Sequence, residues 1–305
     1  MKEFTKLISE KILILDGGMG SLIQSYNLSE RDYRRGIFSK HSNELKGNHD
    51  VLSITRPEII AEIHSLYLNA GADIIETNTF NANAISQSDY GLENFVYELN
   101  YASAEIAKNA VKNFYNDNHH EGPYVAGILG PTNRTCSMSP DVNDPSYRNI
   151  EFDDLVKTYS DQCSGLIDGG ADILMVETVF DTLNCKAALF AIQNVFSKIG
   201  KQLPIMVSVT ITDASGRTLS GQMIEAFWYS VRHVKLASIG INCALGAAEM
   251  RPFLIELTKV ADIPVSVHPN AGLPNELGEY EQSPDQMASI IKDFAESGLV
   301  NIVGG

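Results

Sequence analysis

Short apolar runs alternate with amphipathic stretches from one end of the chain to the other. Most of the runs are continuous rather than alternating, which is typical of strands buried on both faces of a parallel sheet. They predict eight strands, at Lys11–Gly18, Ala72–Phe80, Tyr124–Gly130, Ala171–Val179, Ile205–Ile211, Ala237–Ala244, Ile263–Pro269 and Val300–Gly305.

The stretches between these runs repeat with the 3.6-residue period of a helix. They predict helices at Glu58–Asn69, Asn94–Tyr115, Phe152–Ile167, Leu183–Ile199, Ile224–Val234, Ala248–Val260 and Asp285–Glu296. Such regular alternation favours a (β/α)8 TIM barrel over an open doubly wound sheet. No linker rich in Pro, Gly or Ser divides the chain, so we expect residues 1–305 to form one barrel domain.

Two irregularities interrupt this pattern. The segment Gln24–Pro57 separates the first strand from its helix and is far longer than the usual βα loop of about two to six residues. Because barrel active sites lie at the C-terminal ends of the strands, we expect it to form a wall or lid of the site. The eighth strand runs to Gly305 with no helix after it, so we expect a C-terminally truncated barrel that lacks its last helix and the end of strand eight.

Charge and cysteine content narrow the partners and the compartment. The 23 Lys and Arg residues against 38 Asp and Glu give a net charge of −15, which repels phosphate backbones, so we expect no nucleic-acid partner. Four widely spaced cysteines without a C-x-x-C pair favour a reducing, cytoplasmic location. No stretch approaches the roughly 18 to 20 apolar residues of a membrane helix, and no signal peptide is evident, so we expect no membrane partner.

The predicted strand ends are unusually polar for a barrel, which is normally filled with Val, Ile and Leu. Asp16-Gly17-Gly18 would expose backbone N–H groups that suit a carboxylate or phosphate, although a tight turn explains the glycines equally well. Asp16, Glu76 and Glu177 point to recognition of an amino group or a cation. The alternative is an ion-pair network with Arg134 or Arg217, which we favour for Glu76.

Cysteine and histidine offer further candidates. Cys243, at the end of the sixth strand, suits a nucleophile or a soft-metal ligand, although a lone buried cysteine is more often a small hydrophobe. Cys136 falls in a loop, whereas Cys163 and Cys185 fall on helices, where we expect packing roles. We expect His268 to be satisfied by neighbouring backbone, and the other histidines to lie in loops or on helix surfaces: His41, His49, His64, His119, His120 and His233.

Three common motifs are missing from the chain. There is no G-x-S-x-G, no Walker A loop, and no G-x-G-x-x-G opening a helix after the first strand. Nucleophilic hydrolases and common nucleotide-binding enzymes are therefore disfavoured.

Taken together and in order, the strand-end motifs resemble the homocysteine-binding module of cobalamin-dependent methionine synthase. The betaine- and S-methylmethionine-dependent homocysteine methyltransferases resemble this chain mainly in the glycine turn, the VET strand and the NC motif. The matching stretches span nearly the whole chain: Asp16–Gly20, Leu45–Asp50, Gly71–Phe80, Gly127–Arg134, Ser139–Asn149, Val176–Asn184, Thr210–Gln222, Asn242–Gly246 and His268–Asn275.

This resemblance implies a (β/α)8 barrel whose pocket holds L-homocysteine. Its substrate-binding positions here would be Asp16, Gly17, Gly18 and Glu177, with Asn242 lining the same pocket. The family binds zinc through the cysteine of the NC motif, here Cys243, and through two adjacent cysteines of a Gly-Gly-Cys-Cys-Gly motif. Those two ligands would lie beyond Gly305, and Asn270 is an additional candidate ligand.

The resemblance also implies a reaction. Zinc-bound homocysteine thiolate takes a methyl group from methylcobalamin, which 5-methyltetrahydrofolate recharges on cobalamin-binding and folate-binding modules, and methionine results. Because two of the three thiolate ligands are absent, we expect this chain alone to be poorly active or inactive. The alternatives are a stand-alone homocysteine S-methyltransferase using betaine or S-methylmethionine, and a substrate-binding module that is inactive without the missing cysteines.

Overall fold

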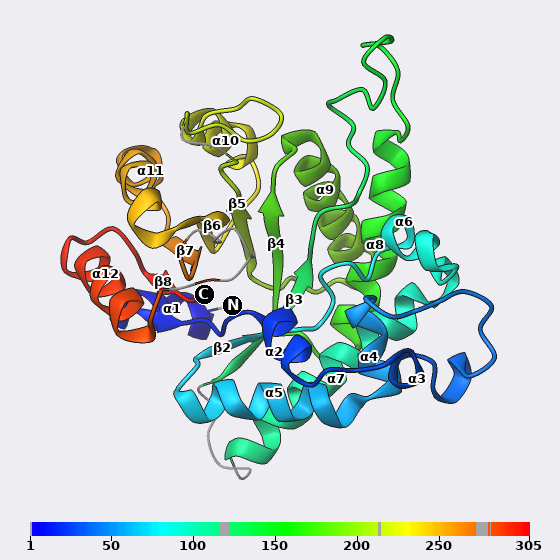
Figure 1. The fold of residues 1–305 in the computed structure, drawn as a ribbon. Coiled ribbons are helices and arrows are strands. Elements are labelled where there is room, and N and C mark those ends of the chain that lie inside the picture. The colour runs from blue at the N-terminus through cyan, green and yellow to red at the C-terminus, as the bar shows by residue number, and fades with distance from the viewer. Residues whose placement is uncertain (1, 116–121, 213–214, 273–279, 281) are drawn as a thin grey trace.

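Eight parallel strands form the barrel in the computed structural model, which describes residues 2–115, 122–212, 215–272, 280 and 282–305 (Figure 1). Their order around the sheet is β1-β8-β7-β6-β5-β4-β3-β2. The strands are β1 (Leu13–Ile14), β2 (Ile74–Glu76), β3 (Tyr124–Leu129), β4 (Ile173–Val179), β5 (Ile205–Val209), β6 (Ser238–Gly246), β7 (Val265–Asn270) and β8 (Ile302–Val303).

The seam between β1 and β2 closes the ring by a single bridge. Leu15 pairs with Ile74, Asp16 N–H donates to the Ile74 carbonyl at 3.0 Å, and Asp73 N–H donates to the Ile14 carbonyl at 2.7 Å. β8 pairs with both β7 and β1, so the predicted (β/α)8 architecture is confirmed.

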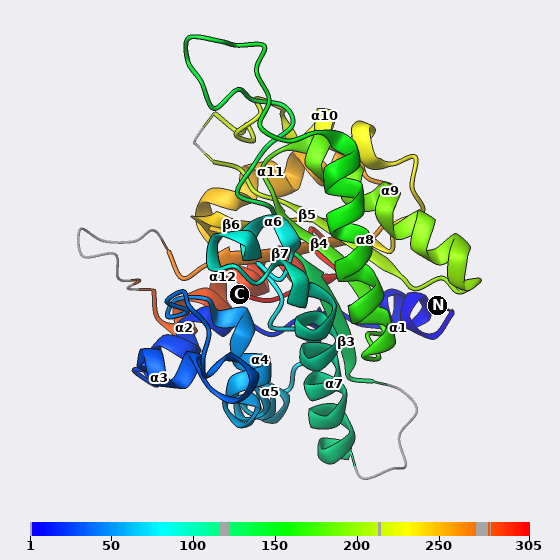
Figure 2. The same cartoon turned by 90° about the vertical axis from the view of Figure 1, so that its right-hand side faces the viewer.

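Helices surround the strands (Figure 2). All seven predicted helices are present, and all but one have ends within two residues of the prediction; α10 stops three residues early, at Val231. The helices are α1 (Lys2–Glu10), α2 (Met19–Ser25), α3 (Glu30–Tyr33), α4 (Leu52–Thr55), α5 (Pro57–Ala70), α6 (Ala84–Gln87), α7 (Val96–Tyr115), α8 (Phe152–Asp168), α9 (Thr182–Ile199), α10 (Ile224–Val231), α11 (Ala247–Val260) and α12 (Pro284–Glu296). Short 3-10 turns lie at Gly36–Phe38, His49–Val51, Ser88–Tyr90 and Glu93–Phe95.

Helix α1 was not predicted, and it packs against the barrel interior. Phe4 and Ile8, one helical turn apart, are 1% and 3% exposed and belong to the same apolar cluster as Leu13 and Ile302 of the barrel strands. This cluster fills the lower part of the barrel, at the N-terminal ends of the strands.

The upper part of the barrel interior is polar. Along β4, Ile173 and Met175 belong to the interior apolar cluster, and the next residue on the same face of the strand is Glu177. Asn242 of β6 pairs in register with His268 of β7, and both side chains are buried. The predicted polar ends of the strands therefore meet at one end of the barrel.

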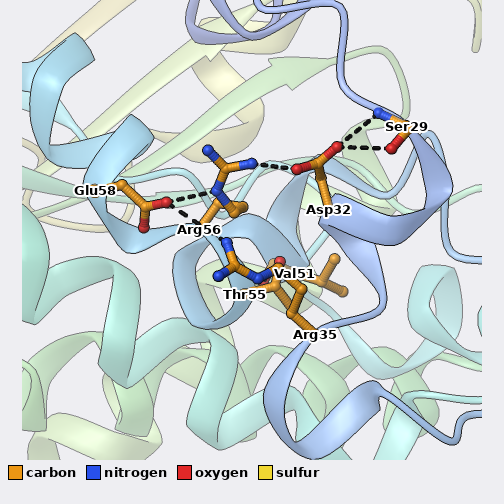
Figure 3. Close-up of polar contacts among 7 residues, drawn as sticks. All are labelled: Ser29, Asp32, Arg35, Val51, Thr55, Arg56 and Glu58. Atoms are coloured by element: carbon orange, nitrogen blue, oxygen red, sulfur yellow. Dashed lines mark hydrogen bonds and ion pairs between the residues drawn. The ribbon is translucent and has the colours of Figure 1, made fainter.

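The predicted insertion Gln24–Pro57 folds as a small helical layer on α5. Figure 3 shows the ion pairs of this layer, in which the Arg56 guanidinium contacts the carboxylates of both Asp32 and Glu58. The distance from Arg56 Nε to Glu58 Oε1 is 2.5 Å. Asp32 also accepts hydrogen bonds from the backbone and hydroxyl of Ser29, at 2.9 and 2.8 Å. These contacts hold the pKa of the Asp32 carboxyl below its usual value, and the hydrogen bonds from Ser29 are the largest cause.

Candidate active site

Three carboxyl groups share the mouth of the barrel. Asp16 and Glu177 are 5% and 9% exposed, Glu76 is partly buried, and the Glu76 N–H donates to Asp16 Oδ2 at 2.9 Å. Asp16 Oδ1 is buried and has no hydrogen-bond partner among the described residues. Burial raises the pKa of all three, to about 7 for Glu177, and the Glu177 charge adds to the rise for Asp16 and Glu76.

The ion-pair network favoured for Glu76 is wrong. Among the described residues, none of the ion pairs involves Asp16, Glu76 or Glu177. Arg217 donates instead to the Gly221 carbonyl at 2.8 Å, and Arg134 is exposed. Glu76 thus belongs to the acidic group at the mouth, which lacks a cation from the described part of the protein.

Asn242 connects the strand ends around this pocket. Its Oδ1 accepts from Ser208 Oγ at 2.5 Å and from Thr178 N–H at 3.1 Å. Its Nδ2 donates to Thr178 Oγ1 at 2.8 Å and approaches both Glu177 Oε2 and Cys243 Sγ at 3.4 Å. Asn242 therefore fixes the relative positions of the carboxylate of β4 and the thiol of β6. Ser208 was not singled out by the sequence, where a lone serine inside an apolar strand is its only signal.

The backbone is strained where these residues lie. Thr178, Cys243 and Ala244 adopt left-handed conformations with φ of +53°, +56° and +61°. Such conformations cost about 1 to 3 kcal/mol each for residues other than glycine and cluster at functional sites. The pairing of β4 with β5 shifts register between Val176 and Val179, and the pairing of β6 with β7 shifts register between Asn242 and Gly246. The strain and the register shifts turn β4 and β6 at the mouth.

The surroundings of Cys243 disfavour its thiolate form. Burial, followed by the charge of Glu177, raises its pKa to about 11. No group of three or more His, Cys, Asp or Glu side chains in the described part of the chain could hold a metal ion. The described residues therefore do not by themselves fit the zinc site that the sequence predicts. The predicted additional ligand Asn270 instead approaches the Tyr280 hydroxyl with its Nδ2, at 3.4 Å.

The glycine turn after β1 leaves donors available. Neither Gly17 N–H nor Gly18 N–H donates a hydrogen bond to a described residue. A Cβ on Gly17 would lie 3.1 Å from Tyr67 Oη and 3.3 Å from the Gly305 carbonyl oxygen, so this residue must be small. Tyr67 was not predicted as a site residue; burial, with the charges of Asp16 and Glu76, raises its pKa to about 12.

Two histidines differ from expectation. The backbone hydrogen bonds expected for His268 are absent, because both ring nitrogens are buried and have no partner among the described residues. Burial lowers its pKa to about 4. His64, expected on a helix surface, is fully buried in α5, and its ring nitrogens also lack described partners. The residues 119–120, 213–214 and 273–275 of the predicted loops and motifs lie outside the described residues.

The buried carboxyl group of Asp50, outside the acidic group at the mouth, holds the insertion to the loop after β2. Asp50 accepts from Asn81 N–H at 3.1 Å and from Gln87 Nε2 at 3.3 Å, and Asn48 Nδ2 donates to Gln87 Oε1 at 2.7 Å. Asn78 Nδ2 donates to the His49 carbonyl at 2.8 Å. The insertion is thereby tied to the C-terminal end of β2, and its role as a wall of the site stays a prediction.

Asp50→Asn is expected to change the pH dependence of stability. Burial raises the pKa of Asp50 to about 7 in the folded protein, so ionising it opposes folding increasingly between about pH 4 and 7. The free energy of unfolding of D50N relative to the parent should therefore rise across this window, by an amount of the order of 4 kcal/mol. Urea unfolding at several pH values measures it, with the surface change Asp161→Asn as the control; parallel profiles for D50N and the parent would contradict the expectation.

Comparisons with known proteins agree with this architecture. A family model described as homocysteine S-methyltransferase matches residues 13–305. The metallated form of the homocysteine methyltransferase MmuM from Escherichia coli is 21% identical with a TM-score of 0.74, covering 99% of this chain and 94% of that one. Its oxidized form is also 21% identical, with a TM-score of 0.72, covering 96% and 90%. In the described part of the chain, no helix combines the length and apolar character needed to span a membrane.

Proposed function

Because this chain belongs to the homocysteine S-methyltransferase family, we propose that it holds L-homocysteine at the barrel mouth for methyl transfer to the sulfur, with methionine as product. One observation carries the proposal. The buried Asp16 and Glu177 and the partly buried Glu76 form an acidic group with no cation among the described residues. A substrate ammonium supplies the missing positive charge.

The amino acid head of homocysteine matches the donors and acceptors at the mouth. Asp16 Oδ1, which has no described partner, is an acceptor for the ammonium, together with Glu177. The unused N–H groups of Gly17 and Gly18 are donors for the substrate carboxylate. Both charges of the head group are thus recognised by residues at the end of β1 and β4, and the side-chain sulfur is left to face β6.

The sulfur must lose its proton before it reacts. A free alkyl thiol has a pKa of about 8.5, so most of it is protonated at neutral pH. In the transfer, the bond between sulfur and the methyl carbon forms as the bond from that carbon to the donor breaks, and the thiol proton leaves to solvent. Zinc, when bound, would supply the charge that favours the thiolate.

The zinc site requires donors from outside the described residues. We propose Cys243 as one zinc ligand and two thiolates directly after Gly305 as the others, with Asn270 as an additional candidate ligand. Two contacts support this placement: Gly305 N–H donates to the Asp16 carbonyl at 3.3 Å, and Gly305 packs against the backbone of Pro269. A residue following Gly305 would therefore start at the mouth.

We propose methylcobalamin as the methyl donor, recharged from 5-methyltetrahydrofolate on partner modules, in the cytoplasm. The nine ordered sequence motifs support the donor, and four free cysteines support the compartment. Betaine and S-methylmethionine are the competing donors. Turnover of the chain extended by Cys-Cys-Gly, measured with each of the three donors and homocysteine, distinguishes them; methionine formed only from betaine or S-methylmethionine would overturn the cobalamin assignment.

Substrate recognition is tested by calorimetry with the 305-residue chain. L-Homocysteine should bind, whereas 4-mercaptobutanoate, which lacks only the ammonium, should bind at least about 10-fold more weakly. L-Methionine serves as a control that keeps the head group and replaces the thiol. Equal affinity for homocysteine and 4-mercaptobutanoate would show that the acidic group does not recognise an ammonium.

A further inference from the structure

The helical layer of the barrel is incomplete beside α10. This helix has 8 residues, whereas its neighbours α9 and α11 have 18 and 14. At 1.5 Å per residue, α10 is about 12 Å long and α9 about 27 Å, so the lower part of β5 and β6 has no helix of its own over it. Figure 1 shows α10 between α9 and α11 on the outside of the barrel.

A cavity of about 720 Å³ occupies this region. Its floor is formed by the starts of β5, β6 and β7, and one face of α9 forms a wall with Leu189, Phe190 and Phe196. Phe152 adds a third aromatic ring, whose centroid is 6.1 Å from that of Phe190. The cavity has the size of a small-molecule site, commonly about 300 to 1,000 Å³.

The apolar wall is left open to solvent. Phe190 is 53% exposed, although the neighbouring Leu189 and Phe196 are 1% and 3% exposed. An exposed phenylalanine beside a cavity is apolar surface that a ligand would remove from water. The three aromatic rings favour a ligand with an aromatic body, which would pack edge to face or offset against them.

The rim of the cavity is positively charged in a protein of net charge −15. Lys186 and Lys235 line it, and within the described ranges neither of them forms an ion pair. The one acidic residue among the described lining residues, Asp262, is paired with Arg232, 3.8 Å from Nη2 to Oδ2. The free charge at the rim is therefore cationic, which complements an anion.

We propose that this cavity, which forms a groove between α9 and the starts of β5, β6 and β7, is a second binding site for a small aromatic anion such as an aryl carboxylate or sulfonate. The aromatic body lies on Phe190 and the neighbouring Phe152, and the anionic group faces Lys186 and Lys235. The groove is at the N-terminal ends of the strands and the homocysteine site at their C-terminal ends. Occupation of one site therefore does not displace a ligand from the other.

The test uses 1-anilinonaphthalene-8-sulfonate, an aromatic anion whose fluorescence rises on apolar surfaces. We expect one saturable site on the 305-residue chain, weakened at least about 10-fold by Lys186→Glu with Lys235→Glu. The matched control Lys112→Glu, on α7 and outside the lining of the cavity, should bind the probe as the parent does. Phe190→Ala removes an exposed ring, and it should also weaken binding without lowering the melting temperature.

Three outcomes would overturn the proposal. The first is probe binding unchanged by the double charge reversal and by Phe190→Ala. The second is displacement of the probe by L-homocysteine, which would place it at the barrel mouth. The third is a loss of probe binding as protein concentration rises, matched by dimerisation in sedimentation, which would assign the groove to a second copy of the chain. Failure of homocysteine binding leaves the probe result unaffected, so the two proposals are tested independently.

Discussion

Changing Cys243 to serine should abolish zinc binding and reduce methyl transfer by about 1,000-fold or more in the chain extended by Cys-Cys-Gly after Gly305. The serine side chain keeps nearly the same volume and can still be approached by Asn242, but it presents a hydroxyl, a far weaker zinc ligand than a thiolate. The variant would keep only the two added thiolates, whereas a catalytic zinc site needs three protein ligands beside the position that the substrate occupies. Metal content after dialysis, together with turnover, measures the effect.

The matched control for this change is Cys136→Ser. Cys136 is buried in the loop after β3, and its sulfur approaches the Ile150 carbonyl at 3.7 Å. Its replacement should leave a full equivalent of zinc. Loss of zinc in the Cys136 variant with retention in the Cys243 variant would transfer the site to a different set of ligands, and so would zinc bound by the 305-residue chain without the added cysteines.

Glu177→Gln should act in opposite directions on affinity and on stability. Gln keeps the acceptor that Asn242 Nδ2 approaches, yet it removes the negative charge that we propose to hold the substrate ammonium. Homocysteine affinity should fall by about 1 to 3 kcal/mol, or roughly 5- to 150-fold. Without substrate the variant should be more stable than the parent above pH 7, because the raised pKa of Glu177 means that its ionisation opposes folding there.

The paired measurement separates recognition from a structural role. Calorimetry with homocysteine gives the affinity, and thermal unfolding at about pH 8 without substrate gives the stability. Glu105→Gln, on the exposed face of α7, is the control and should change neither quantity. A Glu177 variant that lost affinity and stability together would indicate that the carboxylate supports the fold of the mouth rather than the substrate.

The sequence predicted the helices well because their signals are local. α5 begins at Pro57 and ends before Gly71, whose φ of +99° suits the left-handed end of a helix. Some strands were predicted too long: the run Ala72–Phe80 contains β2 only at Ile74–Glu76, because strand-forming residues continue beyond the paired segment. α1 was missed because the segment is short and its apolar residues Phe4, Leu7 and Ile8 alternate with charged and polar ones.

At the site, positions were predictable and partners were not. Parallel strands of a barrel bring their C-terminal ends together, so Asp16, Glu177, Asn242 and Cys243 had to share the mouth. Whether an arginine reaches Glu76, or a carbonyl reaches His268, depends on tertiary distances that no residue pattern encodes. Both expectations were wrong for this reason. The hydrogen bond from Ser208 likewise depends on Asn242 reaching across from β6.

The barrel closes where β1 pairs with β8 and is bridged to β2. This closure determines the stage of protein synthesis at which the mouth can be completed. Asp16 follows the first strand, and the pairing of β1 with β8 requires Ile302 and Val303, which are synthesised nearly 300 residues later. Contacts between such distant residues form slowly, and they cannot form at all while β8 is still inside the ribosome. The nascent chain thus carries an open row of strands until β8 has emerged, and the ring of strands around the mouth closes only then.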